Sequence, residues 1–364
     1  MKSYKTELIL FYVLCFISIL PILFTRYYVT LDGSSHIYNA NLIKSLVFQS
    51  DLETMKLFQI NSIAVPNWMG HFIMAFLRIF LPAFLSEKIL LLLYFILTPL
   101  FFRKFILLFN PSGKIFTYFI FLFTHNVLLY LGFFNMMLGI MFLFISIFYY
   151  HKYCQIFNLK RFIILTLLLL IVYFSHIMIF AITVCFLAIL SFYISDIHSN
   201  NTLRKKILNR LMLLFLSALP SLILAFKYFI LVDSIDEGEP QLPFVKLLTE
   251  FINVQPLLTL SGNNPWKIYT NILFILFTII IISRIIVLVK KVIMAKGSNL
   301  RPKFKIPSFK VVCLLTSFVF LILYFILPNG MMISIRLLLL FYLFFVMWIA
   351  LNEYPKWIHV LTFT

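Results

Sequence analysis

Thr30–Phe48 reads TLDGSSHIYNANLIKSLVF and is the first polar interruption in a chain of long apolar runs. Asp32 lies in a turn that ends the opening apolar segment, and the small residues after it predict a new helix running from His36. The apolar residues of this helix recur along one side, as in an amphipathic helix on a membrane surface; they are Ile37, Ala40, Ile43, Leu46 and Val47. Such a helix needs no Asp32, His36 or Asn39 for its stability, and these groups can accept or relay a proton. We therefore expect the chemistry of the protein here.

The composition assigns the class of protein. Of the 364 residues, 63% are hydrophobic and only 12% are charged, whereas soluble domains are roughly half apolar and a quarter charged. The net charge of +18 comes from basic residues clustered between the apolar runs. This pattern is typical of the positive-inside rule rather than of nucleic-acid binding. We predict a multi-pass membrane protein that contacts membrane lipids and no nucleic acid.

The apolar runs predict an all-α polytopic bundle that forms one integral membrane domain over residues 1–364. Pro66–Pro82 is nearly long enough to cross, but Asn67, His71 and Arg78 share one face, and an arginine facing lipid costs about 3 kcal/mol or more. We therefore expect a re-entrant or juxtamembrane helix there. Ten spans remain, at about 8–24, 85–102, 115–131, 133–150, 162–178, 179–195, 208–231, 268–289, 310–327 and 332–351.

The charge distribution predicts the orientation of these spans. With both termini in the cytoplasm, the basic clusters, including Arg103 and Lys104 and the loop with Cys154, face inward toward anionic lipid headgroups. The compartment expected is the bacterial inner membrane. Two long loops then lie outside, at 26–84 and 232–267. The second is either a lid or a solvated connector, and its acids are Asp233, Asp236, Glu237, Glu239 and Glu250.

The order of these features resembles the GT-C membrane glycosyltransferases, such as the dolichyl-phosphate-mannose-protein mannosyltransferases and the aminoarabinose transferases. A first helix, an Asp-containing turn with an amphipathic helix, an aromatic-rich helix near a proline, and the span entry Ser86-Glu87-Lys88 carry the resemblance over about 150 residues. It extends weakly to Gly132-Phe-Phe-Asn135 and Ile335-Arg336-Leu337. Gly33 follows Asp32 where members of the family usually have a second acid. The resemblance implies a GT-C-like bundle and sugar transfer from a polyprenyl-phosphate lipid on the outer face, with Asp32 as base or metal contact.

Sugar transfer from a lipid phosphate requires a base for the acceptor hydroxyl and stabilisation of the phosphate. Asp32 is the expected base and His36 its alternative, while the plainer interpretation is that Asp32 only caps the helix. Arg336 either holds the donor phosphate through two parallel hydrogen bonds or extends to the lipid headgroups. The residues expected to bind substrate are Asn39, Asn67, His71, His176 and Arg336.

The sequence assigns no metal site. Imidazole and carboxylate groups suit divalent metals, but the separations between Asp32, His36, His71 and His176 follow no ligand spacing, so a divalent metal is only the alternative to a cofactor-free enzyme. Two other functions stay open: a transporter or flippase of a lipid-linked sugar, and a non-catalytic membrane subunit of a polysaccharide assembly system. The concentration of polar groups in one outer loop, without internal symmetry, favours the enzyme.

Overall fold

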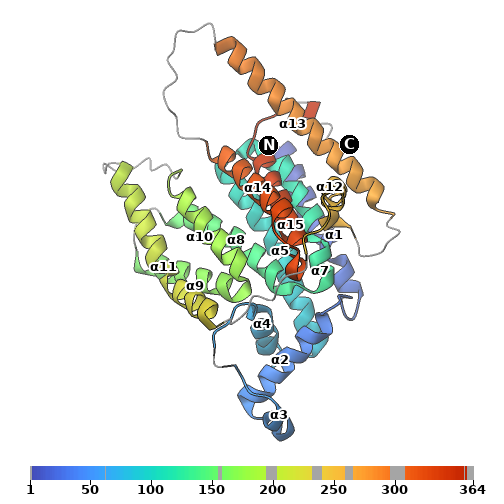
Figure 1. Ribbon diagram of the computed structural model, residues 1–364, viewed down its shortest axis with the longest axis vertical. Coiled ribbons are helices and arrows are strands. Elements are labelled where there is room, and N and C mark those ends of the chain that lie inside the picture. Colours follow the sequence, from blue (N-terminus) through green and yellow to red (C-terminus); the bar gives the residue numbers. More distant parts are fainter. Residues whose placement is uncertain are drawn as a thin grey trace. The chain divides into compact units, whose positions relative to one another are not determined.

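The computed structural model describes residues 2–61, 63–154, 158–193, 203–231, 240–258, 265–295, 308–355 and 357–358. Every regular element in these ranges is a helix (Figure 1). The α-helices and short 3-10 helices (η) are α1 (Lys2–Phe24), α2 (Gly33–Phe48), α3 (Leu52–Leu57), α4 (Met69–Leu77), α5 (Ala83–Phe109), η1 (Pro111–Tyr118), α6 (Phe119–Thr124), α7 (Val127–Leu131), α8 (Phe134–Tyr153), α9 (Leu159–Ser175), α10 (Ile177–Leu190), α11 (Leu203–Leu231), α12 (Phe244–Ile252), η2 (Gln255–Leu257), α13 (Lys267–Ala295), α14 (Phe309–Ile326), η3 (Gly330–Met332) and α15 (Ile333–Ala350).

The protein is an integral multi-pass membrane protein. Within the described ranges, eight segments are helical, long and apolar enough to cross a bilayer, and each matches one predicted span. They are Lys5–Phe24, Ala83–Phe109, Pro111–Leu131, Phe134–Tyr153, Lys205–Leu231, Lys267–Val287, Phe309–Ile326 and Gly330–Ala350.

The other two predicted spans, 162–178 and 179–195, correspond to shorter helices. α9 has 17 residues and α10 has 14, which gives them lengths of about 26 and 21 Å against a hydrocarbon core of about 30 Å. The backbone between them is extended at His176, where φ is −163°.

The predicted juxtamembrane helix is present and is too short to span. α4 has nine residues, which reach about 14 Å. The first long loop also contains α2 and α3, and α4 packs beside α2 (Figure 1). Of the expected apolar side of α2, Ala40 is fully buried but Val47 is 57% exposed, so the buried side is narrower than the pattern predicted.

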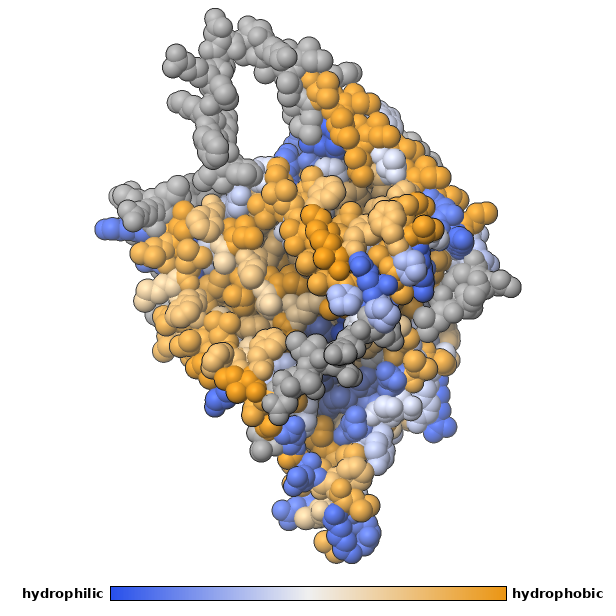
Figure 2. Space-filling model, viewed as in Figure 1, coloured by the Kyte–Doolittle hydropathy of each residue, from blue (hydrophilic) through white to orange (hydrophobic). Residues whose placement is uncertain are grey.

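The chain divides into two compact units. The first comprises the described residues of Met1–Phe105 and Leu129–Ile235, in which α8, α9, α10 and α11 pack on one another and α4 packs on α8 and α9. Hydrophobic side chains cover the visible face over α9 to α11, and hydrophilic ones gather at α3 (Figure 2). The prediction of one membrane domain over residues 1–364 stays a prediction.

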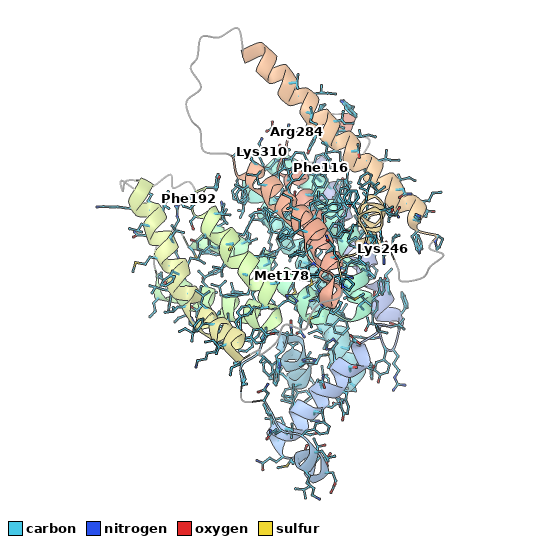
Figure 3. All side chains as sticks on the ribbon, viewed as in Figure 1. Phe116, Met178, Phe192, Lys246, Arg284 and Lys310 are labelled. Atoms are coloured by element: carbon cyan, nitrogen blue, oxygen red, sulfur yellow. The ribbon has the colours of Figure 1, made fainter. Side chains whose placement is uncertain are left out.

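The second unit comprises the described residues of Ile106–Leu128 and Asp236–Thr364 and is built around α15, which packs on α14 and η1. Asn110 donates to the carbonyl of Ala350 at the end of α15. Arg284 and Phe116 (Figure 3) both contact Tyr354: the guanidinium lies 5.7 Å and the phenyl ring 4.8 Å from the centre of its ring. Polar and aromatic contacts therefore fix the end of α15 and the residues that follow it, up to Tyr354.

The second long loop contains a packed helix. Leu247 of α12 is buried, and the carbonyls of Leu247 and Phe251 accept hydrogen bonds from the hydroxyls of Tyr324 and Tyr342. α12 is therefore anchored at these two carbonyls, and the choice between a lid and a solvated connector stays open. The acids Asp233, Asp236, Glu237 and Glu239 lie outside the described residues.

One basic-cluster prediction is corrected by the packing. Arg103 is 4% exposed and makes two 2.7 Å hydrogen bonds to the carboxylate oxygens of Glu7, so it joins α5 to α1 instead of touching headgroups. Lys104 stays exposed. Cys154, expected in a basic loop, directly follows α8 and is 1% exposed.

Candidate functional site

The site forms around the start of α2. This helix begins at Gly33, three residues before the predicted start, with Asp32 at its N-cap position. The Asp32 side chain makes no capping hydrogen bond to α2 and is exposed. Asp51 has the same position on α3 and does cap it, accepting from the Glu53 amide and the Thr54 hydroxyl. The capping interpretation of Asp32 is therefore not supported by its contacts.

A second segment of the chain holds Asp32 in place. Gly132 has φ of +92°, and a Cβ atom there would lie 2.7 Å from Cβ and 2.9 Å from the amide nitrogen of Asp32. Only glycine adopts this left-handed conformation freely and leaves room for the Asp32 backbone. The Leu31 amide also donates to the Tyr130 carbonyl over 2.8 Å. The turn at 130–132 thus positions the carboxylate.

His36 and His71 form a hydrogen-bonded pair between α2 and α4. His36 Nδ1 lies 2.8 Å from His71 Nε2, and His36 Nε2 lies 2.6 Å from the Gly132 carbonyl oxygen. A carbonyl only accepts, so His36 Nε2 carries a proton and donates it. In neutral His36, Nδ1 is then an acceptor for His71. Asp32 acts on His36 electrostatically.

The buried side-chain amide of Asn135, at the start of α8, positions the first turn of α4 and with it His71. Its Nδ2 donates to the Asn67 carbonyl over 2.6 Å, and its Oδ1 accepts from the Gly70 amide over 2.7 Å. A Cβ atom on Gly70 would lie 3.0 Å from that oxygen, so glycine allows the close approach. The Trp68 amide also donates to the Phe174 carbonyl. The start of α4 is therefore held from two helices.

Burial disfavours the charged form of both rings. It lowers the pKa of His36, an effect that the Gly132 carbonyl and the Asp32 charge partly oppose. It lowers the pKa of His71 to about 4, and the nearby His36 adds to that shift. His71 also bonds to the Asn67 backbone. Three hydrogen-bond contacts thus connect the Gly132 carbonyl, the two imidazole rings and the Asn67 backbone. Two neutral imidazoles supply only two N–H protons for these three contacts. The pair has a place for one more proton.

Two cavities flank α2 in this unit. One, of about 240 Å³, has a mostly apolar lining that includes Leu42, Ile43, Trp68, Asn39 and His71. The other, of about 400 Å³, is lined by Tyr27, Tyr28, Thr30, Ser34, Ile37 and Glu87. At 100° per residue, their α2 residues lie on opposite sides of the helix. Arg78 of α4 donates to Asn41 of α2 over 2.7 Å, which keeps α4 against the helix between the two cavities.

The predicted substrate-binding residues have different places. His71 lies in the site, and Asn39 lines the smaller cavity. Asn67, with φ of +66°, contributes its backbone carbonyl, and its side chain is exposed. His176 is buried where α9 meets α10, and a Cβ atom on Gly139 would lie 3.4 Å from its Cβ. Arg336 belongs to the second unit, on α15. Their roles stay predictions.

The described residues contain no group of three or more His, Cys, Asp or Glu side chains that could hold a metal ion. Comparison with known proteins gives a short result. No protein-family model, curated protein or solved structure matches the chain. The candidate site therefore rests on its own geometry and on the residues that carry the resemblance.

Sequence reasoning missed three contributors to the site. In the sequence, Gly132 and Asn135 belong only to the weak extension of the resemblance, and Glu87 only to the span entry. A glycine and an asparagine three positions apart at the beginning of a long apolar segment are a weak signal of a tight turn and a helix start. Nothing in the local pattern shows which distant residues they contact.

Proposed function

We propose that the protein is a membrane glycosyltransferase that moves a sugar from a polyprenyl-phosphate donor to a hydroxyl acceptor at the outer face of the membrane. The observation that carries the proposal is the carboxylate of Asp32, which is exposed at a helix start without capping it and stands beside the His36–His71 pair. The resemblance of the first 150 residues to the GT-C glycosyltransferases supports the same role.

In this reaction the covalent changes occur in the substrates, and the protein contributes a proton acceptor and binding sites. The bond between the anomeric carbon and the phosphate oxygen breaks, and its electron pair stays with the phosphate. The acceptor oxygen bonds to the anomeric carbon and loses its proton to Asp32, the general base. Asp32 is exposed, so the proton that it takes passes to solvent and the carboxylate regains its charge for the next turnover.

The smaller cavity suits the lipid end of the donor. Leu42, Ile43 and Leu46 of α2 and Ile60 give it an apolar wall, which would favour the first isoprenoid carbons. Asn39, on the same wall, has an amide that can donate to a phosphate oxygen. Membrane lipids surround the spans.

The finer architecture is part of this proposal. It comprises a GT-C-like bundle in which α9 and α10 complete ten membrane crossings, both termini in the cytoplasm, and a place in the bacterial inner membrane. The unusual share of basic residues between the apolar runs supports this orientation.

The test measures sugar transfer by the purified protein from a radiolabelled polyprenyl-phosphate sugar. It compares substitutions of Asp32 and Asp51, which both occupy the N-cap position of a helix. Asp32→Asn should lower transfer by about 100-fold to 10,000-fold, the usual contribution of a general base, with no change in apparent Tm. Asp51→Asn should leave transfer intact, because Asn caps a helix about as well as Asp. Wild-type turnover in the Asp32 variant would contradict the proposal.

Two additions to the same assay separate the alternatives. Loss of transfer in the presence of a chelator would assign a divalent metal to the reaction. If the protein moved the lipid-linked sugar across a vesicle membrane without breaking the bond to phosphate, it would be a flippase instead.

A further inference from the structure

The larger cavity beside α2 contains buried oxygen atoms that the fold leaves unsatisfied. Glu87 is 1% exposed, and its Oε2 is buried without a hydrogen-bond partner among the described residues. Thr30 Oγ1, in the same cavity, is also buried without a partner. A buried polar group without a hydrogen bond destabilises a protein, and a carboxylate does so more than a hydroxyl. Both residues line this cavity, so a ligand that enters it is the candidate partner for the two oxygens.

Gly33 lets these two side chains pack closely against the start of α2. A Cβ atom at this position would lie 2.4 Å from Thr30 Oγ1 and 2.9 Å from Glu87 Oε1. The Tyr28 backbone meanwhile hydrogen-bonds to the Glu87 carboxylate. The carboxylate is therefore positioned by the protein, and one of its oxygens is left for a ligand.

The remaining lining indicates the chemistry of that ligand. Tyr27, which is 45% exposed, supplies an aromatic ring, whereas the Tyr28 ring is buried and stacks on Tyr130. The hydroxyls of Thr30 and Ser34 supply donors and acceptors. The volume of about 400 Å³ lies within the range of about 300–1,000 Å³ that is usual for small-molecule sites. A metal cation fits this site poorly, because it wants several charged or carbonyl oxygens in a tight shell and the cavity lining has a single carboxylate.

We propose that the cavity lined by Glu87, Thr30 and Gly33 binds a sugar ring, whose hydroxyls donate to Glu87 Oε2 and pair with Thr30 Oγ1 while its apolar face lies on the Tyr27 ring. The choice of a sugar rests on the proposed function. The cavity lies on the other side of α2 from the apolar one, so this helix separates a site for a hydroxyl-rich ring from a site for a lipid chain.

Saturation-transfer NMR on the full chain in detergent tests the proposal, with a mixture of methyl glycosides of glucose, mannose, galactose and arabinose as probes. At least one glycoside should give a signal in the wild-type protein. Glu87→Gln, which keeps shape but removes the charge, should weaken its binding tenfold or more. Thr30→Val, which replaces only the hydroxyl by a methyl group, should weaken it as well, and Gly33→Ala should abolish it.

Asn39→Ala is the matched control, because Asn39 lines only the smaller cavity. It should leave glycoside binding unchanged. Apparent Tm values show that the variants fold, and Thr30→Val, as the most conservative change, decides the outcome if Gly33→Ala does not fold. Glycoside signals that survive Glu87→Gln and Thr30→Val would overturn the proposal. So would the absence of any signal together with a thermal shift by Mg²⁺ or Ca²⁺ that Glu87→Gln removes.

The ring could come from the donor or from the acceptor, and two lipids distinguish these sources. If Glu87→Gln weakens binding of a polyprenyl-phosphate sugar but not of bare polyprenyl phosphate, the cavity holds the sugar of the donor. If neither lipid is affected while glycoside binding is lost, it holds the acceptor. If the wild-type protein binds a glycoside but transfers no sugar from the radiolabelled lipid, only the proposed function is refuted. If Glu87→Gln transfers sugar normally and binds glycosides as the wild type does, only the present proposal is refuted.

Discussion

At the scale of single residues, Asp32 and Asp51 occupy the same position on two helices and differ in what their carboxylates do. Asp51 accepts hydrogen bonds from its own helix. Asp32 makes no such bond, and the turn at Gly132 holds its backbone from the side. A helix whose start lacks a side-chain cap is less stable by about 1 kcal/mol. This carboxylate is thus kept free of a structural task, as a base requires.

The histidine pair predicts how stability depends on pH. The pKa of His71 is about 4 in the folded protein and about 6.5 in an unfolded chain. Between these values the unfolded chain binds more protons, so stability rises with pH. On acidification, stability should begin to fall near pH 6.5 and continue to fall until about pH 4, and it should be insensitive to this group above pH 7.

The measurement is the apparent Tm between pH 4.5 and pH 7.5. His71→Gln keeps a polar atom near Nε2 but has no proton to gain, so its Tm should fall less steeply below pH 6.5. Lys56→Gln, an exposed change on α3, serves as the control and should keep the wild-type slope. An unchanged slope in His71→Gln would mean that another group sets the acid sensitivity.

At the scale of elements, the contact between α8 and the start of α4 depends on one amide. Asn135 both donates and accepts, and Asp can only accept. Asn135→Asp would set a carboxylate oxygen 2.6 Å from the Asn67 carbonyl oxygen. We expect it to lower stability by about 1–3 kcal/mol and to reduce transfer, since His71 would no longer be held against His36.

Asn61→Asp gives the matched control for this element. The Asn61 side chain only accepts a hydrogen bond, from the Ile63 amide over 2.9 Å, and Asp preserves that bond. Its apparent Tm and its transfer rate should equal those of the wild type. If both variants behaved alike, the amide of Asn135 would not be what positions α4.

At the scale of the whole molecule, the orientation of the chain can be tested with cysteine labelling. Cys154 is buried and Cys185 is exposed, so the background should carry Cys185→Ser. In it, Ser50→Cys should react with a membrane-impermeant maleimide in intact cells, and Ser112→Cys only after permeabilisation. Both serines are exposed, so access to the residue itself does not limit labelling. Labelling of Ser112→Cys from outside would invert the proposed topology.

The two long loops show how far loop length alone predicts structure. The first was expected to hold a surface helix and a juxtamembrane helix, and the structure has α2 and α4 there, with α3 in addition. The second was expected to be a lid or a connector, and its described part is a helix whose carbonyls are bound by tyrosine hydroxyls. The hydroxyl contacts come from α14 and α15, far along the chain, and no local pattern indicates them.

The sequence by itself determined the membrane class, the helical fold and the positions of eight long apolar helices, because hydropathy and helical period are properties of neighbouring residues. Tertiary structure decided which side chains meet. Arg103 and Lys104 are adjacent and alike in charge, yet a rotation of about 100° along the helix places one on Glu7 and leaves the other exposed. In the same way, packing brought His71 to His36 and Gly33 to Glu87. Such contacts depend on the relative placement of separate helices, and the spacing of residues within each helix does not encode it.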